Sequence, residues 1–316
     1  MIDIKDQYFG TEIQMTGITR QLAAEVVAEM FGTKAVCEEP YYETWSVKDR
    51  NGQKWEFGYD KSIMTETKSG RHIMEAGRDY STKMISPKLS YDEMGKLQEV
   101  VRCLKRHGGF VNESCGQYVQ VDASNHTPQS LKNALTIMYG KEDILFNAIK
   151  IHPLRAYSFC QKVRPEVLKR IREIPSKSLT MEQIKNIWQE ECIKANKPYD
   201  SIREYALNLD TVFSKGTLEW RCFEGTLHAE KVQANITLAL AISAKAINQK
   251  TVQMKKTPIT ENPAYTFRTF LLELGLCGRE YKNIRQQLME NLEEHKSYQI
   301  LTESKEVKHN RQGNIR

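Results

Sequence analysis

The sequence lacks the cysteine and glycine patterns that mark several common functional classes. Its seven cysteines are scattered from Cys37 to Cys277 without a CxxC pair, so neither a disulfide framework nor a zinc ribbon is expected. No GxGxxG or GxxxxGK segment is present, which argues against dinucleotide-binding and P-loop folds. We therefore expect reduced, mostly packed cysteines and neither of these nucleotide-binding architectures.

Long apolar runs are also absent. No segment is apolar over the length needed to span a bilayer, and residues 1–14 lack the basic segment and apolar run of a secretory signal. We expect a cytoplasmic protein that does not associate with a membrane. Apolar residues make up 40% and charged residues 27% of the 316 residues, which is typical of a globular chain with a packed core.

The formal net charge of +6 is unevenly distributed along the chain. Residues 1–46 hold eight acids and three bases, so the positive charge lies in the remainder. Part of it is concentrated between Arg155 and Arg172, with only Glu166 and Glu173 as nearby acids. A nucleic-acid partner is not expected, because interleaved aromatic residues and recognition motifs are missing. The bases in this run are Arg155, Lys162, Arg164, Lys169, Arg170 and Arg172.

Three segments show the alternation of a β-strand that has one polar face. They are Tyr8–Thr16, Tyr118–Asp122 and Thr217–Phe223. Their other faces are mostly apolar, which indicates packing against a hydrophobic layer. The polar faces are predicted to carry Glu12 and Gln14, then Tyr118, Gln120 and Asp122, then Thr217, Glu219, Arg221 and Phe223.

Other segments predict helices, a hairpin and a further strand. Two aromatic runs flank Asn51-Gly52, a pair that favours the tight turn of a hairpin. The run from Tyr80 to Ser86 contains Lys83 and reads as a strand that ends before a proline. Capping residues and apolar repeats predict helices over residues 19–31, 90–108, from 127 onward with a break near 174–175, and from 229 to the 290s. The first of these helices is expected to pack through Leu22, Val26 and Met30.

These elements predict an α+β fold with a central sheet flanked by helices. We expect a single domain over residues 1–300, with a helical insertion at about residues 131–200. The polar segment 301–316 is expected to be a flexible tail.

The polar strand faces would line one concave surface if they pointed the same way. Carboxylates beside an arginine are costly to bury unless they bind a cation or one another, so such a convergence indicates a functional site. The alternative is that these positions face solvent on an open sheet. Spacing alone leaves both interpretations open.

The residues of these strands resemble the amidoligase family. The segments FGTEIQMTG, YSTKMISPKL, VNESCGQYVQVD and LNLDTVFSKGTLEWRCFEGT follow the order and approximate spacing of that family's motifs. The resemblance runs from about residue 8 to residue 290. It is most specific in Glu219-Trp220-Arg221 and in the strand after Cys115-Gly116.

This resemblance implies an antiparallel catalytic sheet like that of glutamine synthetase and glutamate-cysteine ligase. It also implies ATP-dependent joining of a small-molecule or peptide carboxylate to an amine through an acyl phosphate, with magnesium held by acidic residues. Glu12 matches the first glutamate of the family's FGxExE strand, and Glu219 and Arg221 match its TxExR strand. These three are the implied catalytic residues, and the two glutamates are the implied metal ligands. Arg203 and Arg155 fall near family arginines and are candidate binders of phosphate or substrate carboxylate.

Several positions depart from the family pattern. Gln14 stands where the second glutamate of FGxExE belongs, and Lys83 stands where the glutamate of the ELVSP strand belongs. Tyr118 and Gln120 replace both histidines of the family's HVH strand, whereas Asp60 survives from a DGS-like turn. Losing two anionic ligands and gaining a lysine should weaken magnesium binding, although a lysine can hold a phosphate as a point charge. These four replaced positions are candidate substrate-binding or nucleotide-binding residues.

Three functional hypotheses follow. The first is a degenerate amidoligase-like protein with impaired catalysis, which binds a ligand or a protein partner through a former ligase site. The alternative is an active ATP-dependent amidoligase with an unorthodox metal arrangement. The third, nucleic-acid binding through residues 155–172, would require an affinity that falls steeply with salt.

Overall fold

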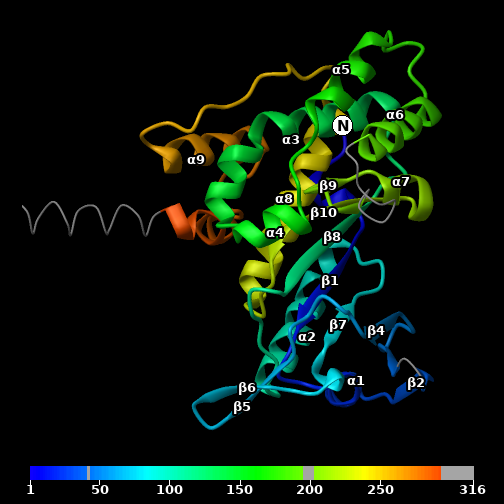
Figure 1. The fold of residues 1–316 in the computed structure, drawn as a ribbon, viewed down its shortest axis with the longest axis vertical. Coiled ribbons are helices and arrows are strands. Elements are labelled where there is room, and N and C mark those ends of the chain that lie inside the picture. Colours follow the sequence, from blue (N-terminus) through cyan, green and yellow to red (C-terminus); the bar gives the residue numbers. More distant parts are fainter. Residues whose placement is uncertain (41–42, 195–202, 293–316) are drawn as a thin grey trace, which may run out of the picture.

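One large antiparallel sheet runs through the protein (Figure 1). The computed structural model describes residues 1–40, 43–194 and 203–292. The strand order is β2-β3-β4-β7-β1-β8-β10-β9, and every neighbouring pair is antiparallel. This confirms the expectation of an α+β fold built on an antiparallel sheet. The strands are β1 (Phe9–Met15), β2 (Ala35–Glu39), β3 (Thr44–Lys48), β4 (Lys54–Gly58), β7 (Thr82–Ile85), β8 (Gly116–Asp122), β9 (Leu207–Asn208) and β10 (Thr217–Glu224).

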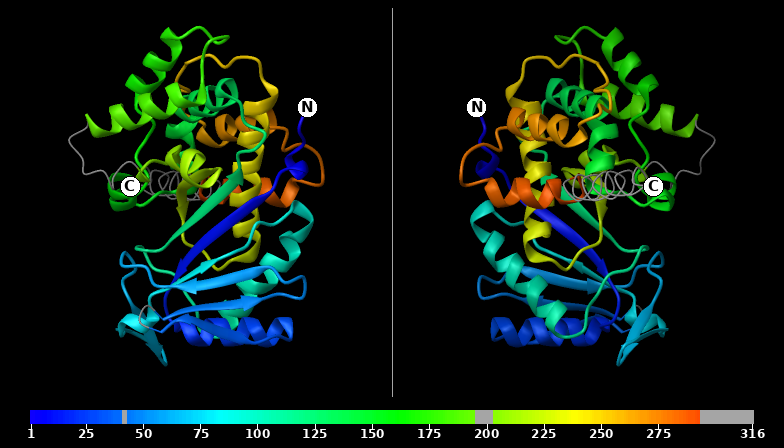
Figure 2. Two further views of the ribbon diagram at one scale, coloured as in Figure 1. Left: turned by 90° about the vertical axis from the view of Figure 1, so that its right-hand side faces the viewer. Right: turned by 90° about the vertical axis from the view of Figure 1, so that its left-hand side faces the viewer.

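Three helices cover one face of this sheet (Figure 2). Helix α1 (Arg20–Phe31) packs on β2, β3, β4 and β7, and α8 (Ala229–Asn248) packs on β1 and β8. Helix α2 (Met94–Arg106) lies between them and contacts both. Helix α3 (Pro128–Ile149) runs against α8 and touches β10. The opposite face of the central strands is therefore left to polar side chains.

The remaining helices gather around α3 and the β9–β10 edge. Helix α5 packs on α3 and on α6, and α6 contacts α7, which follows β9. The chain continues as helix over residues 282–292 after α9. No helix within the described residues is long and apolar enough to cross a membrane. These helices are α4 (Pro153–Ser158), α5 (Pro165–Glu173), α6 (Met181–Ile193), α7 (Asp210–Lys215) and α9 (Pro263–Glu273), with single 3-10 turns at η1 (Ile4–Asp6), η2 (Arg78–Tyr80) and η3 (Tyr91–Glu93).

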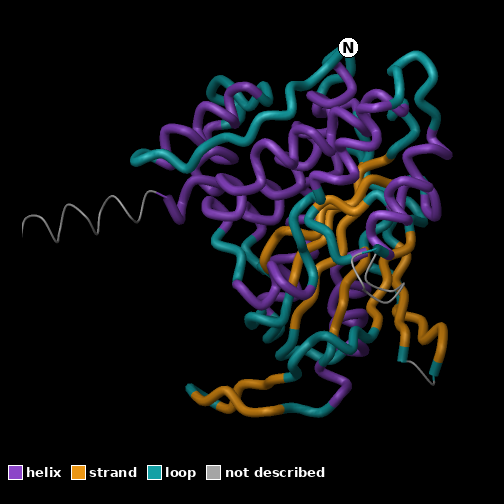
Figure 3. Tube along the Cα trace, turned by 45° about the horizontal axis from the view of Figure 1, so that its top comes forward, coloured by secondary structure: helices purple, strands orange, loops and turns teal. Residues whose placement is uncertain are grey.

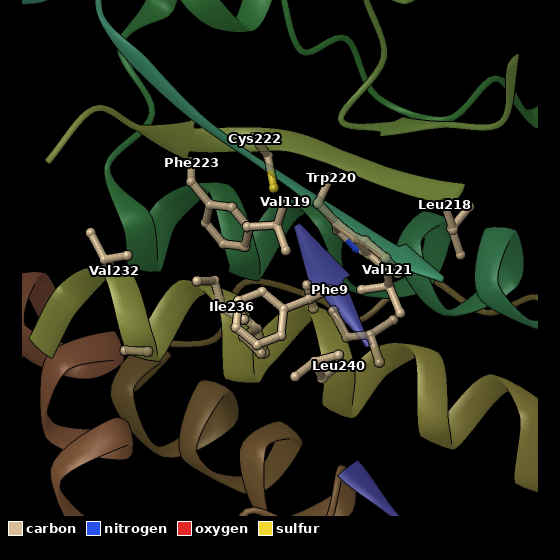
Figure 4. Packing of buried hydrophobic residues seen from close by; sticks show 14 of the residues in the cluster. Phe9, Val119, Val121, Leu218, Trp220, Cys222, Phe223, Val232, Ile236 and Leu240 are labelled. Atoms are coloured by element: carbon tan, nitrogen blue, oxygen red, sulfur yellow. The ribbon is translucent and has the colours of Figure 1, made fainter. Parts of the chain in front are cut away.

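The main core lies between α8 and strands β1, β8 and β10 (Figure 4). Apolar side chains on the odd or even positions of each strand point toward α8, as the alternation predicts. Truncating one such side chain to alanine typically costs about 2–5 kcal/mol of stability. The core residues shown in Figure 4 include Phe9, Val119, Val121, Leu218, Trp220, Cys222, Phe223, Val232, Ile236 and Leu240, all buried.

The prediction that Phe223 shares the polar face of β10 is wrong. Trp220 pairs with Val119, but Phe223 pairs with Gln117, so β10 contains one extra residue between these pairs. This β-bulge shifts the alternation, and Phe223 turns toward the core beside α8 (Figure 4). Glu224 consequently returns to the polar face, because it pairs with Gly116.

Most predicted capping signals are confirmed. Thr19, Thr127 and Thr180 each accept a hydrogen bond from a backbone N–H of the first turn, and Gly32 ends α1 with φ of 70°. The predicted helix break near 174–175 is present, since α5 ends at Glu173. The hairpin predicted around Asn51-Gly52 is formed by β3 and β4.

Other local expectations differ from the structure. Leu22 is predicted to lie on the buried face of α1, but it is 41% exposed. The small side chains of Ala23 and Ala24 are buried instead. The polar insert before Tyr80 contains a separate hairpin of β5 (Glu66–Ser69) and β6 (His72–Glu75) (Figure 3). Residues 249–262 interrupt the long C-terminal helices expected there. Part of the predicted insertion, residues 195–200, and the predicted tail, residues 301–316, lie outside the described residues.

A glycine after β1 holds the central strand against the loop that follows α2. Gly17 has φ of +78°, and a Cβ there would lie 2.3 Å from Cδ1 of Phe110. Gly32 has a similar φ of +70°, but nothing lies within 4 Å of a Cβ built on it. We predict that Gly17→Ala lowers the free energy of unfolding by roughly 2 kcal/mol more than Gly32→Ala, because only the first adds a steric clash to the unfavourable φ. Chemical denaturation of both variants measures this difference, and equal losses would contradict it.

Candidate functional site

A cavity of about 520 Å³ opens on the polar face of the sheet. Strands β1, β7, β8 and β10 form its floor, and α7 and the loop after β4 form two of its sides. The structure therefore shows that the polar faces of these strands converge on one cavity. Its lining residues are Glu12, Gln14, Asp60, Lys61, Ser62, Lys83, Tyr118, Phe159, Arg203, Glu204, Thr211, Ser214, Lys215, Glu219 and Arg221.

Gln120 links the two glutamates that match the family motifs. Its Nε2 donates to Oε1 of Glu12 at 3.2 Å and to Oε1 of Glu219 at 3.1 Å. Strand register explains this bridge, because Gln120 on β8 lies directly opposite Glu219 on β10. Glu12 lies diagonally across on β1, since its direct partner is Tyr118. One neutral amide thus holds two carboxylates on the sheet face.

The other oxygen of Glu219 also accepts hydrogen bonds from protein donors. Asn208 on β9 donates to Oε2 at 2.9 Å, and Nη1 of Arg221 approaches the same oxygen at 3.3 Å. The Arg221 guanidinium lies 4.2 Å from the centre of the Tyr118 ring, in a cation–π contact. Burial raises the pKa of the Tyr118 hydroxyl, so this phenol stays neutral at physiological pH.

Lys83 places an ammonium group between two carboxylates. Its Nζ lies 3.4 Å from Oδ2 of Asp60 and 3.8 Å from Oε2 of Glu12. Burial raises the pKa of Glu12, and the charge of Lys83 acts in the opposite direction. Burial also acts to raise the pKa of Asp60, but hydrogen bonds from Ser62 and the charge of Lys83 outweigh it, so that pKa is lowered.

Gln14 has a position that suits an amide better than a carboxylate. Its Oε1 accepts from the backbone N–H of Gly116 at 2.7 Å, and its Nε2 donates to Oγ of Ser62 at 3.1 Å. The hydroxyl of Ser62 in turn donates to Asp60 at 2.7 Å. A glutamate could not donate to Ser62 while that hydroxyl is committed to Asp60. Gln14 therefore ties β1 to β8 and to the turn that carries Asp60.

The two candidate anion-binding arginines, Arg203 and Arg155, lie in different parts of the structure. Arg203 lies on the rim, is 61% exposed and pairs with Asp210 at 3.5 Å. Arg155 is buried next to the cavity without lining it, and it pairs with Glu224 at 3.5 Å. A Cβ at Gly116 would lie only 2.3 Å from an Arg155 nitrogen, so the glycine makes room for this guanidinium.

Asp122 also lies outside this cavity. It is on the polar face as predicted but forms an ion pair with Lys88, away from the cavity lining. Burial acts to raise the pKa of Asp122, but the hydrogen bond from Lys88 outweighs it, so that pKa is lowered. Cys115 is buried, and burial raises the pKa of its thiol, which agrees with a packing role rather than a nucleophilic one.

Sequence reasoning missed the side chains that complete the cavity from loops and α7. Asn208 had a signal, because it lies in the LNL segment of the family motif, but its contact with Glu219 depends on the pairing of β9 with β10. Lys215 gave no sequence signal, and Lys61 is notable in the sequence only as the replacement for the glycine of the DGS-like turn; both are exposed residues that line the cavity. Including these residues, four carboxylates and five lysine or arginine side chains line the cavity. The cavity therefore favours anions over cations.

The donor set does not fit a magnesium ion. Magnesium requires oxygen ligands in near-octahedral geometry, whereas Glu12 and Glu219 already accept from Gln120, Asn208 and Arg221. The ammonium of Lys83 lies beside Glu12 and Asp60, where a further cation would be repelled. Among the residues that the structure describes, no group of three or more histidine, cysteine, aspartate or glutamate side chains could hold a metal ion.

The sheet and its site define the class of protein, and comparison with known proteins identifies the family. The antiparallel sheet with carboxylate, amide and cationic side chains on one face defines an α+β protein with a sheet-face site. A protein-family model described as "Putative amidoligase enzyme" matches residues 5–243, and the chain belongs to this family. This confirms the resemblance seen in the strand motifs, and the chain is a ligase-like protein.

One solved structure aligns with this chain at low similarity. The crystal structure of a bifunctional glutathione synthetase from Pasteurella multocida aligns with 90% of this chain at 11% identity and a TM-score of 0.38. The chain spans about half, 47%, of the length of that structure. No curated protein sequence matches the chain.

The contact between Lys83 and Glu12 leads to a prediction about ionisation. We predict that Lys83→Met raises the pKa of Glu12 further, because it removes the positive charge that favours the ionised carboxylate in a buried position. Carbon-detected NMR titration of the glutamate carboxyls measures this pKa. Lys61→Met removes a charge from the exposed rim and should change the Glu12 pKa less. Equal effects of the two variants would show that Lys83 has no specific influence.

Proposed function

We propose that this amidoligase-family protein is catalytically impaired and uses the former ligase site to bind an anionic ligand. The observation that carries the proposal is the position of Lys83 between Glu12 and Asp60. An ammonium at this point places a positive charge on the sheet face where the family pattern has a glutamate. A ligand phosphate can then be bound without a metal ion, but in-line activation by magnesium is lost.

The two amides in the site support the same conclusion. Gln14 and Gln120 lie among the carboxylates, and their amide groups form hydrogen bonds with other groups of the protein. In a catalytic metal site, carboxylate oxygens would instead be free to coordinate the metal ion. The present network therefore stabilises the sheet face in the absence of a metal.

The expected ligand carries a phosphoryl or carboxylate group. The cavity volume of about 520 Å³ is in the range of small-molecule sites, and it could admit part of a nucleotide such as ATP or the end of a peptide. Arg221 and Lys83 lie on the floor, whereas Lys61, Arg203 and Lys215 line the outer part. This arrangement favours a ligand with its negative charge along the cavity. A protein partner that inserts an acidic or carboxyl-terminal segment would meet the same requirement.

The alternative is an active ATP-dependent amidoligase. It is favoured by one observation: Glu12, Glu219 and Arg221, the residues that match the family motifs, do lie together on this cavity. In such an enzyme, Lys83 and Arg221 would orient the transferred phosphoryl group and a carboxylate would meet an amine at the sheet face.

Calorimetric titration of ATP with and without magnesium separates the two functions. We predict that magnesium does not strengthen ATP binding to the native protein and that ATP is not turned over. A variant with Gln14→Glu, Lys83→Glu, Tyr118→His and Gln120→His should gain magnesium dependence, because it restores anionic and imidazole ligands. Lys61→Glu makes the same charge change as Lys83→Glu at the exposed rim and should not gain it.

A phosphate-release assay tests the active-ligase alternative. If the native protein releases phosphate only when an amine and a carboxylate are both present, and Glu219→Ala or Arg221→Ala abolishes that release, the active-ligase alternative is correct. Thermal unfolding of each variant distinguishes loss of activity from loss of the fold.

A further inference from the structure

The basic run between Arg155 and Arg172 does not form one positive surface. The structure pairs most of its members with carboxylates, chiefly from other parts of the chain, and much of the charge expected from the sequence is locally neutralised. The ion pairs join Arg155 to Glu224, Lys162 to Asp143, Arg164 to Glu166, and Arg170 to both Glu190 and Glu191.

Arg172 is different. It donates from Nη2 to the backbone carbonyl of Val252 at 2.9 Å, and it forms no ion pair with any acid in the described ranges. This bond attaches the end of α5 to the segment that leaves α8 and passes beside α5 on its way to α9 (Figure 1). The guanidinium is thereby fixed while most of its donors stay available.

A second cation meets Arg172 in a cavity of about 340 Å³. Lys132 projects from α3 and, like Arg172, forms no ion pair with a described carboxylate. Ser176 and Thr251 add hydroxyl groups, and no acidic residue lines the cavity. The complete lining is Gln129, Lys132, Asn133, Arg172, Ser176, Thr251 and Val252.

Two like charges are held together here without compensation. Burial lowers the pKa of Lys132, and the charge of Arg172 lowers it further. The packing of α3 against α5 keeps the two helices together, and the bond from Arg172 to Val252 holds this guanidinium at the cavity. An anion between them would replace repulsion by two charge-assisted contacts.

We propose that this cavity binds a small oxyanion, either free phosphate or a phosphate monoester. Two cations and two hydroxyl groups match the charge of a phosphoryl group, about −1.5 to −2 near neutral pH, and its three acceptor oxygens. The site is separate from the sheet cavity, since the two share no lining residue. It does not rest on the function proposed for that cavity.

Calorimetric titration of inorganic phosphate into the full chain, at constant ionic strength, tests the proposal. We expect binding to weaken by roughly tenfold in Lys132→Gln and in Arg172→Gln, because each removes one charge-assisted contact. Lys169→Gln is the matched control, since Lys169 is exposed on the same helix as Arg172 but does not line the cavity. Lys83→Gln identifies any phosphate that binds in the sheet cavity, because this variant should change binding there and not the contribution of Lys132 and Arg172.

The unfolding temperature of the phosphate-free protein gives a second test of the proposal. Lys132→Gln should keep or raise the unfolding temperature of the phosphate-free protein, because Arg172 then loses a repulsive neighbour rather than an attractive one. Phosphate should then raise the unfolding temperature of the native protein more than that of the variant. Titration with glycerol 3-phosphate shows whether the ester binds more tightly than the free ion. Phosphate affinity that is unchanged in both Lys132→Gln and Arg172→Gln, or a response that chloride reproduces at the same ionic strength, overturns the proposal.

Discussion

The packing of α8 against strands β1, β8 and β10 is the constraint on which the site depends. Because alternate side chains of a strand point to opposite faces, burying Phe9, Val119 and Trp220 against this helix sends the intervening residues to the other face. Glu12 and Glu219 are among these residues, and a register error of one position would bury them in the core. The apolar pattern thus sets the positions of the polar groups.

Much of this arrangement can be predicted from sequence, because alternation and capping are local signals. The three polar strands, the cap at Thr127 and the convergence of Glu12 with Glu219 and Arg221 follow from such signals together with family motifs. Their chemical roles remain predictions. The glutamine synthetase-like identity of the sheet likewise remains a proposal.

Other features depend on contacts that no local pattern contains. The bulge in β10 is visible only in its pairing with β8, and Asp122 leaves the site because Lys88 reaches it from another part of the chain. Arg155 is drawn into the interior by Glu224, whose orientation itself results from the bulge. The dispersal of the basic run has the same origin: Arg155, Lys162 and Arg170 each pair with an acid that the fold, rather than the sequence, brings near.

The bulge also makes the pairing of β10 as important as its composition. If β10 kept its length but continued in regular alternation past Trp220, Glu224 would lie on the opposite face of the sheet. Arg155 would then be buried without its carboxylate, a situation that costs about 3–5 kcal/mol when one partner of a buried pair is removed. The bulge, and not only the composition of β10, therefore decides that a carboxylate meets the guanidinium of Arg155.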